Sequence, residues 1–175
     1  AVALAVGRRG YLRPQEIILL RQQHVRFLDR EGQTSAVLAL IRPKTRYRAS
    51  RVQAVVLSDS ITVALLAHVH ASMRQGELLV PAGQTALTKR FHRLLCALGA
   101  DKVGYTPGSL RPGGVVSDFV AGAANLTEIM FKGRWQTTQS VSRYLQSGMA
   151  AFAAAGLPPD CLTLCTTLSR ELLFL

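Results

Sequence analysis

Five residues, spread over 132 positions of the chain, are of the types that can attack and hold a phosphodiester: Arg13, Lys44, Arg111, Trp135 and Tyr144. A phenol can attack phosphorus and form a phosphotyrosyl ester, while two guanidinium groups stabilise the charge on the nonbridging oxygens. A lysine can protonate the departing 5′ oxygen, and an indole N–H can donate to the phosphate. The order and types of these residues indicate cleavage of a phosphodiester without a metal ion.

Each of these residues also has an ordinary interpretation on its own. Among 21 basic residues, a single arginine is most often a surface residue, and a loop lysine is often simply solvated. A single tryptophan is most often packed in the core, and a tyrosine is often a partly buried structural residue. Two features of the context favour the chemical interpretation. Glu16 follows Arg13 by three positions, close enough on a helix to orient it, and Arg111 falls near a predicted helix N-terminus.

The residues that must position these side chains form helices and one hairpin. Pro14 at a first helical turn predicts a helix over 15–23, and 29–32 is typical of a turn. Two short strands are predicted at 36–41 and 52–57. Between them lies 42–51, a basic loop that would carry Lys44.

The rest of the chain is predicted to be helical, apart from a short extended piece at 77–80. Ser58 or Asp59 can cap a helix that runs to about residue 75, and Gly99 can end a helix over 85–98. The other predicted helices are 107–124, 126–132, 137–146 with Tyr144 on it, and 161–175. The fold class is therefore mainly α with a small antiparallel sheet.

The charge balance points to an acidic partner. The chain has 175 residues, with 21 Lys and Arg against 10 Asp and Glu, a net charge of +11. Such an excess favours nucleic acid, although a basic protein without that partner is the alternative. No apolar run is long enough to span a bilayer, so no membrane partner is expected. The three cysteines lack metal-ligand spacing and are expected to be buried free thiols: Cys96, Cys161 and Cys165.

Taken together, these residues resemble the catalytic domain of the tyrosine recombinases, the phage integrase family. That family shows the order Arg, Lys, His-x-x-Arg, His or Trp, then Tyr, which Arg13, Lys44, Arg111, Trp135 and Tyr144 follow. The Leu-Arg-x-x-Glu setting of Arg13 and the nine-residue step from Trp135 to Tyr144 are also similar. The Gly133-Arg-Trp135 motif is similar to a eukaryotic, transposon-derived branch. Two features depart from the family pattern. Gly108 stands where the family has its histidine, and Pro112 and Gly113-Gly114 directly follow Arg111.

The resemblance implies the fold of the DNA breaking-rejoining enzymes, with a catalytic domain over 1–150 and a C-terminal helical tail over 151–175. It implies cleavage and rejoining of double-stranded DNA in recombination or integration, through a 3′-phosphotyrosyl intermediate. No cofactor is implied, and homo-oligomers could assemble on DNA. The amino-terminal domain that clamps the DNA is expected to be absent. The location would be intracellular, and nuclear in a eukaryote.

The substitution at Gly108 keeps a second hypothesis open, because glycine can neither transfer a proton nor donate through a side chain. The chain could be a degenerate, transposon-derived module that binds DNA without cutting it. A type IB topoisomerase and a basic RNA-binding protein of another fold are more distant alternatives.

Overall fold

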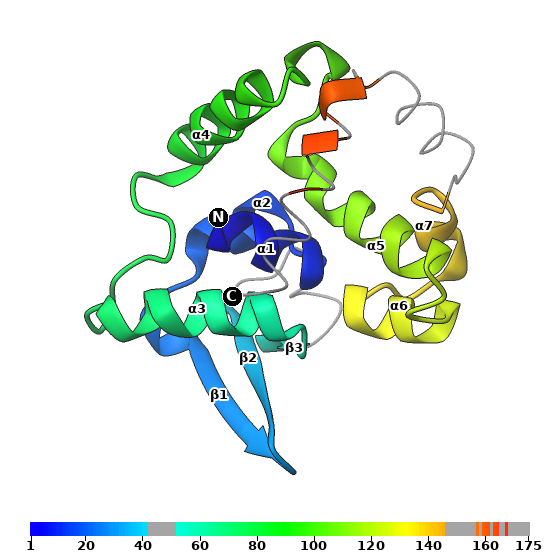
Figure 1. Cartoon of the computed structure of the whole chain (residues 1–175). Coiled ribbons are helices and arrows are strands. Elements are labelled where there is room, and N and C mark those ends of the chain that lie inside the picture. Colours follow the sequence, from blue (N-terminus) through cyan, green and yellow to red (C-terminus); the bar gives the residue numbers. More distant parts are fainter. Residues whose placement is uncertain (42–51, 146–156, 158, 162, 165–166, 168–175) are drawn as a thin grey trace.

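The computed structural model describes residues 1–41, 52–145, 157, 159–161, 163–164 and 167 (Figure 1). It is mainly helical with one small antiparallel sheet, as the sequence predicts. The helices are α1 Val2–Arg9, α2 Pro14–Leu19, α3 Ser60–Ser72, α4 Gly83–Ala97, α5 Leu110–Val120, α6 Leu126–Gly133 and α7 Thr138–Ser142. The strands are β1 Val25–Arg30, β2 Gln33–Ile41 and β3 Val52–Leu57. Short 3₁₀ turns are η1 Gln22–His24, η2 Asp101–Val103 and η3 Pro107–Ser109.

The sheet has three strands in the order β1-β2-β3, all antiparallel. The predicted hairpin of strands 36–41 and 52–57 is confirmed by the antiparallel pairing of β2 with β3, whereas the third strand, β1, was not predicted. Residues 29–32 do not form a four-residue turn, since β1 continues to Arg30 and pairs with Gln33. The turn itself is Glu31-Gly32, both with positive φ. Strand β1 is hard to recognise because it is mostly exposed and shows no clear apolar alternation.

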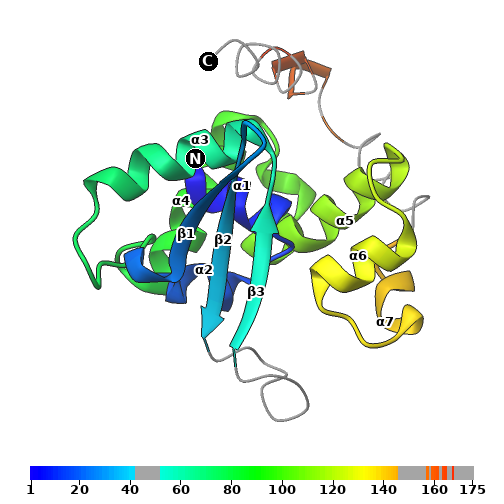
Figure 2. The same cartoon turned by 90° about the horizontal axis from the view of Figure 1, so that it is seen from below.

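The main core lies where one face of the sheet packs against helices. Alternate residues of β2 are buried, namely Ala36, Leu38 and Leu40. These belong to one apolar cluster with residues of α1, α2 and α3, including Val6 and Ile17. Figure 2 shows the three strands side by side with helices behind them. Helix α1 was not predicted, and the sequence signal for it is weak because it contains Gly7, a poor helix former.

A second core lies under α5, α6 and α7 and contains Tyr11, Val115, Ile129 and Val141. Trp135 and Tyr144 pack against this cluster. In both views α6 and α7 lie together at one end of α5 (Figures 1 and 2). Tyr11, which follows α1, therefore lies in the same cluster as Trp135 and Tyr144, which come much later in the chain.

Several helix boundaries follow local signals that the sequence carries. Asp59 caps α3 by accepting the backbone N–H of Thr62, and Gly99 follows α4 with φ of 66°. Other boundaries differ. Residues 77–80 contribute only an isolated bridge from Leu78 to Arg21, and α2 stops at Leu19.

The structure describes only part of the C-terminal region, so only some of the predictions made for it can be compared with the structure. Helix α7 ends at Ser142, so Tyr144 lies just beyond it and not on it. Cys96 is exposed, which contradicts the expectation of a buried thiol, while Cys161 is buried. Cys165 and most of the predicted tail over 151–175 lie outside the described residues. Within the part of the chain that the structure describes, no helix has the length and apolar character needed to cross a bilayer.

Candidate functional site

The site begins at Tyr11, just after α1, where the backbone takes a left-handed conformation with φ of 47°. This conformation is rare for a bulky residue and persists only where the surroundings hold it. Tyr11 is fully buried, and its hydroxyl donates to Asp118 Oδ2 on α5 over 2.6 Å. Burial, this hydrogen bond and the charge of Asp118 raise the pKa of the Tyr11 phenol. Tyr11 is therefore a protonated structural tyrosine and no candidate nucleophile.

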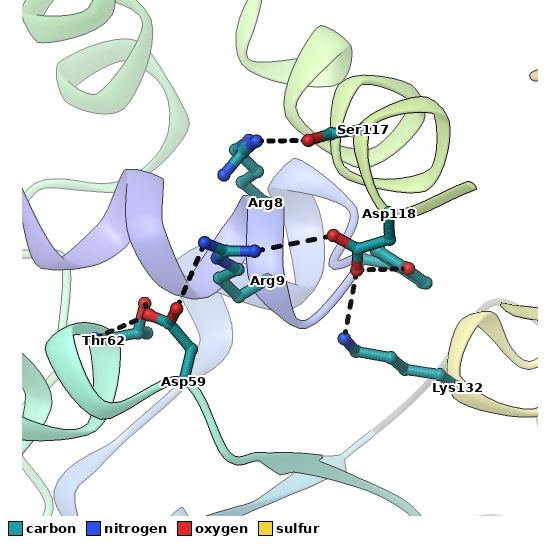
Figure 3. Close-up of polar contacts among 8 residues, drawn as sticks. Arg8, Arg9, Asp59, Thr62, Ser117, Asp118 and Lys132 are labelled. Carbon is teal, nitrogen blue, oxygen red and sulfur yellow. Dashed lines mark hydrogen bonds and ion pairs between the residues drawn. The ribbon is translucent and has the colours of Figure 1, made fainter. Parts of the chain in front are cut away.

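A polar network joins α1, the start of α3, α5 and α6 (Figure 3). Arg9 of α1 pairs with Asp59 at the start of α3 over 3.1 Å and with Asp118 over 3.5 Å. Lys132 of α6 also reaches Asp118, over 3.5 Å, and lies above the Tyr11 ring at 4.6 Å. Asp118 is thus shared by residues from α1, α6 and the Tyr11 turn, and it ties these elements to α5.

Arg111, near the start of α5, is buried and bridges two backbone segments. Its Nη1 donates to the carbonyl of Tyr11 over 2.6 Å and its Nη2 to the carbonyl of Gly133 over 2.7 Å. The left-handed turn at Tyr11 directs that carbonyl toward the guanidinium. The guanidinium also lies 4.2 Å from the centre of the Trp135 ring, which is a close cation–π contact.

Trp135 lies between Arg111 and Tyr144. Its ring centroid is 5.4 Å from that of Tyr144 and 6.3 Å from that of Tyr11. Only glycine fits at position 133, because a Cβ there would lie 1.6 Å from Trp135 Cζ3. The Gly-x-Trp motif therefore has a packing reason: the indole folds back over the glycine.

Tyr144 is half-buried and is held after α7 by its backbone N–H, which donates to Val141 over 2.8 Å. Its phenol is close enough to Arg111 to act on the pKa of that guanidinium. Burial and the charges of Arg13 and Arg134 lower the pKa of Arg111 to about 10, while Glu16 and Tyr144 act in the opposite direction. Arg111 stays a cation at neutral pH, beside the phenol.

Glu16, on α2, is buried, and the guanidinium groups of three arginines lie near its carboxylate. Arg13 Nη1 donates to its Oε1 and Arg134 Nη2 to its Oε2, both over 2.8 Å, while Arg111 Nη1 lies 4.0 Å from Oε2. The Glu16 carboxylate also accepts the backbone N–H of Arg13 over 2.8 Å. The expected contact of Glu16 with Arg13 is confirmed, and the carboxylate fixes Arg13 through both its backbone and its side chain.

Arg134 was not singled out by the sequence reasoning, although it stands inside the Gly-Arg-Trp motif. It ends α6 in a left-handed conformation with φ of 60° and ψ of 38°, where glycine is the usual residue. Tyr11 was passed over in the same way. Helix α6 was predicted from the sequence to end at residue 132, whereas it runs to Gly133, so the left-handed position that normally takes glycine falls on Arg134.

The structure brings together five of the six predicted site residues, namely Arg13, Glu16, Arg111, Trp135 and Tyr144. Lys44 lies outside the described residues. Gly108 is exposed in η3, three residues before Arg111. A Cβ at Gly108 would meet only Thr106 Oγ1, at 3.2 Å.

The arrangement can bind an anion and hold a phenol beside it. Two of its cations are mostly buried, where guanidinium groups are worth more to an anion than in water. Among the described residues, no three His, Cys, Asp or Glu side chains gather as a metal site would require. Compared with models of known protein families and with curated protein sequences, the chain matches neither a family nor a protein.

Proposed function

We propose that this chain is a tyrosine recombinase catalytic domain that cleaves and rejoins double-stranded DNA. The observation that supports it is the meeting of Arg13, Arg111, Trp135 and Tyr144 from segments 131 positions apart in sequence. Surface residues with unrelated roles have no reason to converge in this way. A mainly helical fold with a small antiparallel sheet also agrees with the proposal.

In the proposed reaction, the Tyr144 oxygen attacks phosphorus, and the bond between phosphorus and the 5′ oxygen breaks. The phenol gives its proton to solvent water, and Lys44 gives a proton to the departing 5′ oxygen and regains one from solvent. Arg13 and Arg111 hold the nonbridging oxygens, and Trp135 supports the phosphate and keeps Arg111 in place. Rejoining is the reverse: a 5′ hydroxyl attacks the phosphotyrosine and releases Tyr144. The number of phosphodiester bonds is conserved, so the cycle needs no energy source.

The test is covalent trapping on DNA. The target sequence is open, so the substrate is a pool of nicked suicide duplexes with a randomised segment beside the nick. Loss of the short 5′-hydroxyl fragment prevents rejoining and leaves an adduct that survives SDS. Without added metal, the wild-type chain should give this adduct and Tyr144→Phe should give none.

Tyr105→Phe is the matched control, because Tyr105 packs partly buried against another apolar cluster. It should form the adduct like the wild type. An adduct of equal yield in Tyr144→Phe would refute the proposed nucleophile. An absence of adduct with every duplex in the pool would refute the cleavage reaction.

Gly108 favours a second function, a DNA-binding module that no longer cuts. Losing one acid–base group removes about two to four powers of ten in rate. A module of this kind would bind duplex DNA in a salt-sensitive way, give no adduct, and bind equally well with Tyr144→Phe. The trapping experiment, read together with binding, separates the two functions.

A further inference from the structure

Arg134 has donors that the protein itself leaves unpaired. Its Nη2 is shared between Glu16 Oε2, over 2.8 Å, and the carbonyl of Tyr11, over 3.4 Å. Its Nε and Nη1 are buried without a hydrogen-bond partner among the described residues. The side chain is only 9% exposed. Buried unpaired donors cost free energy, so their presence calls for an explanation.

The charges around Arg134 also favour a bound anion. Three arginines, Arg13, Arg111 and Arg134, share one carboxylate, Glu16. The cluster therefore has two more positive charges than negative ones. Burial lowers the pKa of Arg134, and so does the charge of Arg13, while Glu16 opposes both. Such a cluster is more stable when an anion lies against it.

An arginine at position 134 also costs conformational free energy. The left-handed conformation at the end of α6 favours glycine or asparagine over a long side chain. Glu16 already has Arg13 as an ion-pair partner, so its charge does not require Arg134. These observations indicate a use for the Arg134 guanidinium other than closing the helix.

We infer that Arg134 is a third phosphate-binding arginine, which donates from Nε and Nη1 to the phosphodiester that Arg13 and Arg111 hold. The inference rests on the proposed function for its natural ligand, a DNA phosphate. It assigns Glu16 a double role, since one carboxylate orients Arg13 and Arg134 on the same anion. Two nitrogens of a planar guanidinium fit two oxygens of a phosphate, a geometry that lysine cannot reproduce.

The first measurement uses inorganic phosphate with the whole chain. The melting temperature is followed as phosphate replaces chloride at constant ionic strength, and an apparent Kd is derived from the stabilisation. Wild type should be stabilised. Arg134→Gln should bind phosphate at least about tenfold more weakly, since it loses a charge-assisted fork. Arg30→Gln is the matched control, because Arg30 is exposed at the far end of β1, and it should bind like wild type.

Arg134→Lys separates binding from a merely structural role. It keeps the positive charge beside Glu16 but lacks the fork. A structural ion pair alone predicts wild-type phosphate affinity in Arg134→Lys, whereas the inference predicts weakened affinity with normal melting in chloride. Wild-type affinity in both variants, or no stabilisation of wild type by phosphate, would overturn the inference. The lysine variant also keeps the test valid if Arg134→Gln folds poorly.

The second measurement is the rate of covalent adduct formation on the suicide duplex pool. Arg134→Gln should slow it by about 10²–10³-fold, as for other lost phosphate donors. An unchanged rate in Arg134→Gln would overturn the inference and leave the proposed function standing. Phosphate binding that depends on Arg134, with no adduct from any variant, would support the anion site and remove the cleavage reaction.

Discussion

At the scale of single residues, the site is organised by two groups that accept rather than donate. The carbonyl of Tyr11 receives Arg111 and, at longer range, Arg134, and the carboxylate of Glu16 receives Arg13 and Arg134. Fixed acceptors hold the guanidinium groups in one geometry before any ligand binds. Preorganised donors of this kind stabilise developing charge without reorganisation during the reaction.

Gly108 is the residue at which the proposed chemistry can be improved. Around its Cβ position the nearest atom is Thr106 Oγ1 at 3.2 Å, and its φ is not in the left-handed region. The Thr106 hydroxyl has only to yield slightly, so a side chain should be accommodated on this exposed turn. Gly108→His is expected to raise the rate of adduct formation by about 10²–10⁴-fold through acid–base catalysis.

Gly108→Ala is the control, because it adds the Cβ without the imidazole. It should keep the wild-type rate and a similar melting temperature. The measurement is single-turnover adduct formation on the suicide duplexes as a function of pH. If histidine and alanine give the same rate, a missing acid–base group at position 108 does not limit the reaction.

At the scale of elements, the close approach of α1 to α5 positions Arg111. Gly114 makes this possible, because a Cβ there would lie 2.1 Å from the carbonyl oxygen of Arg8. The sequence analysis flagged Gly113 and Gly114 only as a departure after Arg111. Pro112 lies in the first turn of α5, where its missing N–H leaves no helical hydrogen bond unmade.

The neighbouring glycines allow a sharp test of this packing. Gly114→Ala should lower the free energy of unfolding by about 1–3 kcal/mol, because α1 must move away from α5. Gly113→Ala should raise it by about 0.5–1 kcal/mol, since Gly113 is exposed within the helix and its Cβ position is free. Urea denaturation measures both. Equal effects of the two substitutions would contradict the packing role of Gly114.

At the scale of the whole molecule, the dominant feature is charge. The net charge is +11, and many basic residues outside the site are exposed. The exposed basic residues among those described are Arg21, Arg26, Arg30, Arg74, Lys89, Arg90, Arg93, Lys102 and Arg143. They extend over several elements, which fits a broad contact with a polyanion better than a single small pocket.

DNA binding should therefore depend steeply on salt. Each phosphate that the protein neutralises releases condensed counterions, so log K should fall against log salt concentration with a slope of about −0.9 per phosphate. Fluorescence anisotropy with a labelled duplex over a NaCl series measures the slope. A duplex of the same sequence with neutral methylphosphonate linkages is the control and should bind weakly. A flat salt dependence would exclude DNA as the partner proposed from charge.

The features that the sequence alone determined are those that depend on neighbours along the chain. Three such features each involve residues at most a few positions apart: the cap of α3 at Asp59, which was one of two neighbouring candidates, the end of α4 before Gly99, and the contact of Glu16 with Arg13. Local hydrogen bonds and backbone preferences suffice for these, and the sequence shows them directly. The mainly helical class with a small antiparallel sheet followed from the same local patterns.

The tertiary structure alone decided which of these residues meet. Glu16 reaches Arg134 across 118 positions and Arg111 reaches the Tyr11 carbonyl across 100, and no local pattern encodes such pairs. The strand β1, the left-handed turn at Tyr11 and the buried, unpaired donors of Arg134 likewise depend on packing between distant segments. Burial arises only when distant segments pack together. Because Arg111 and Arg134 are buried, their guanidinium groups would interact more strongly with an anion than exposed arginines do.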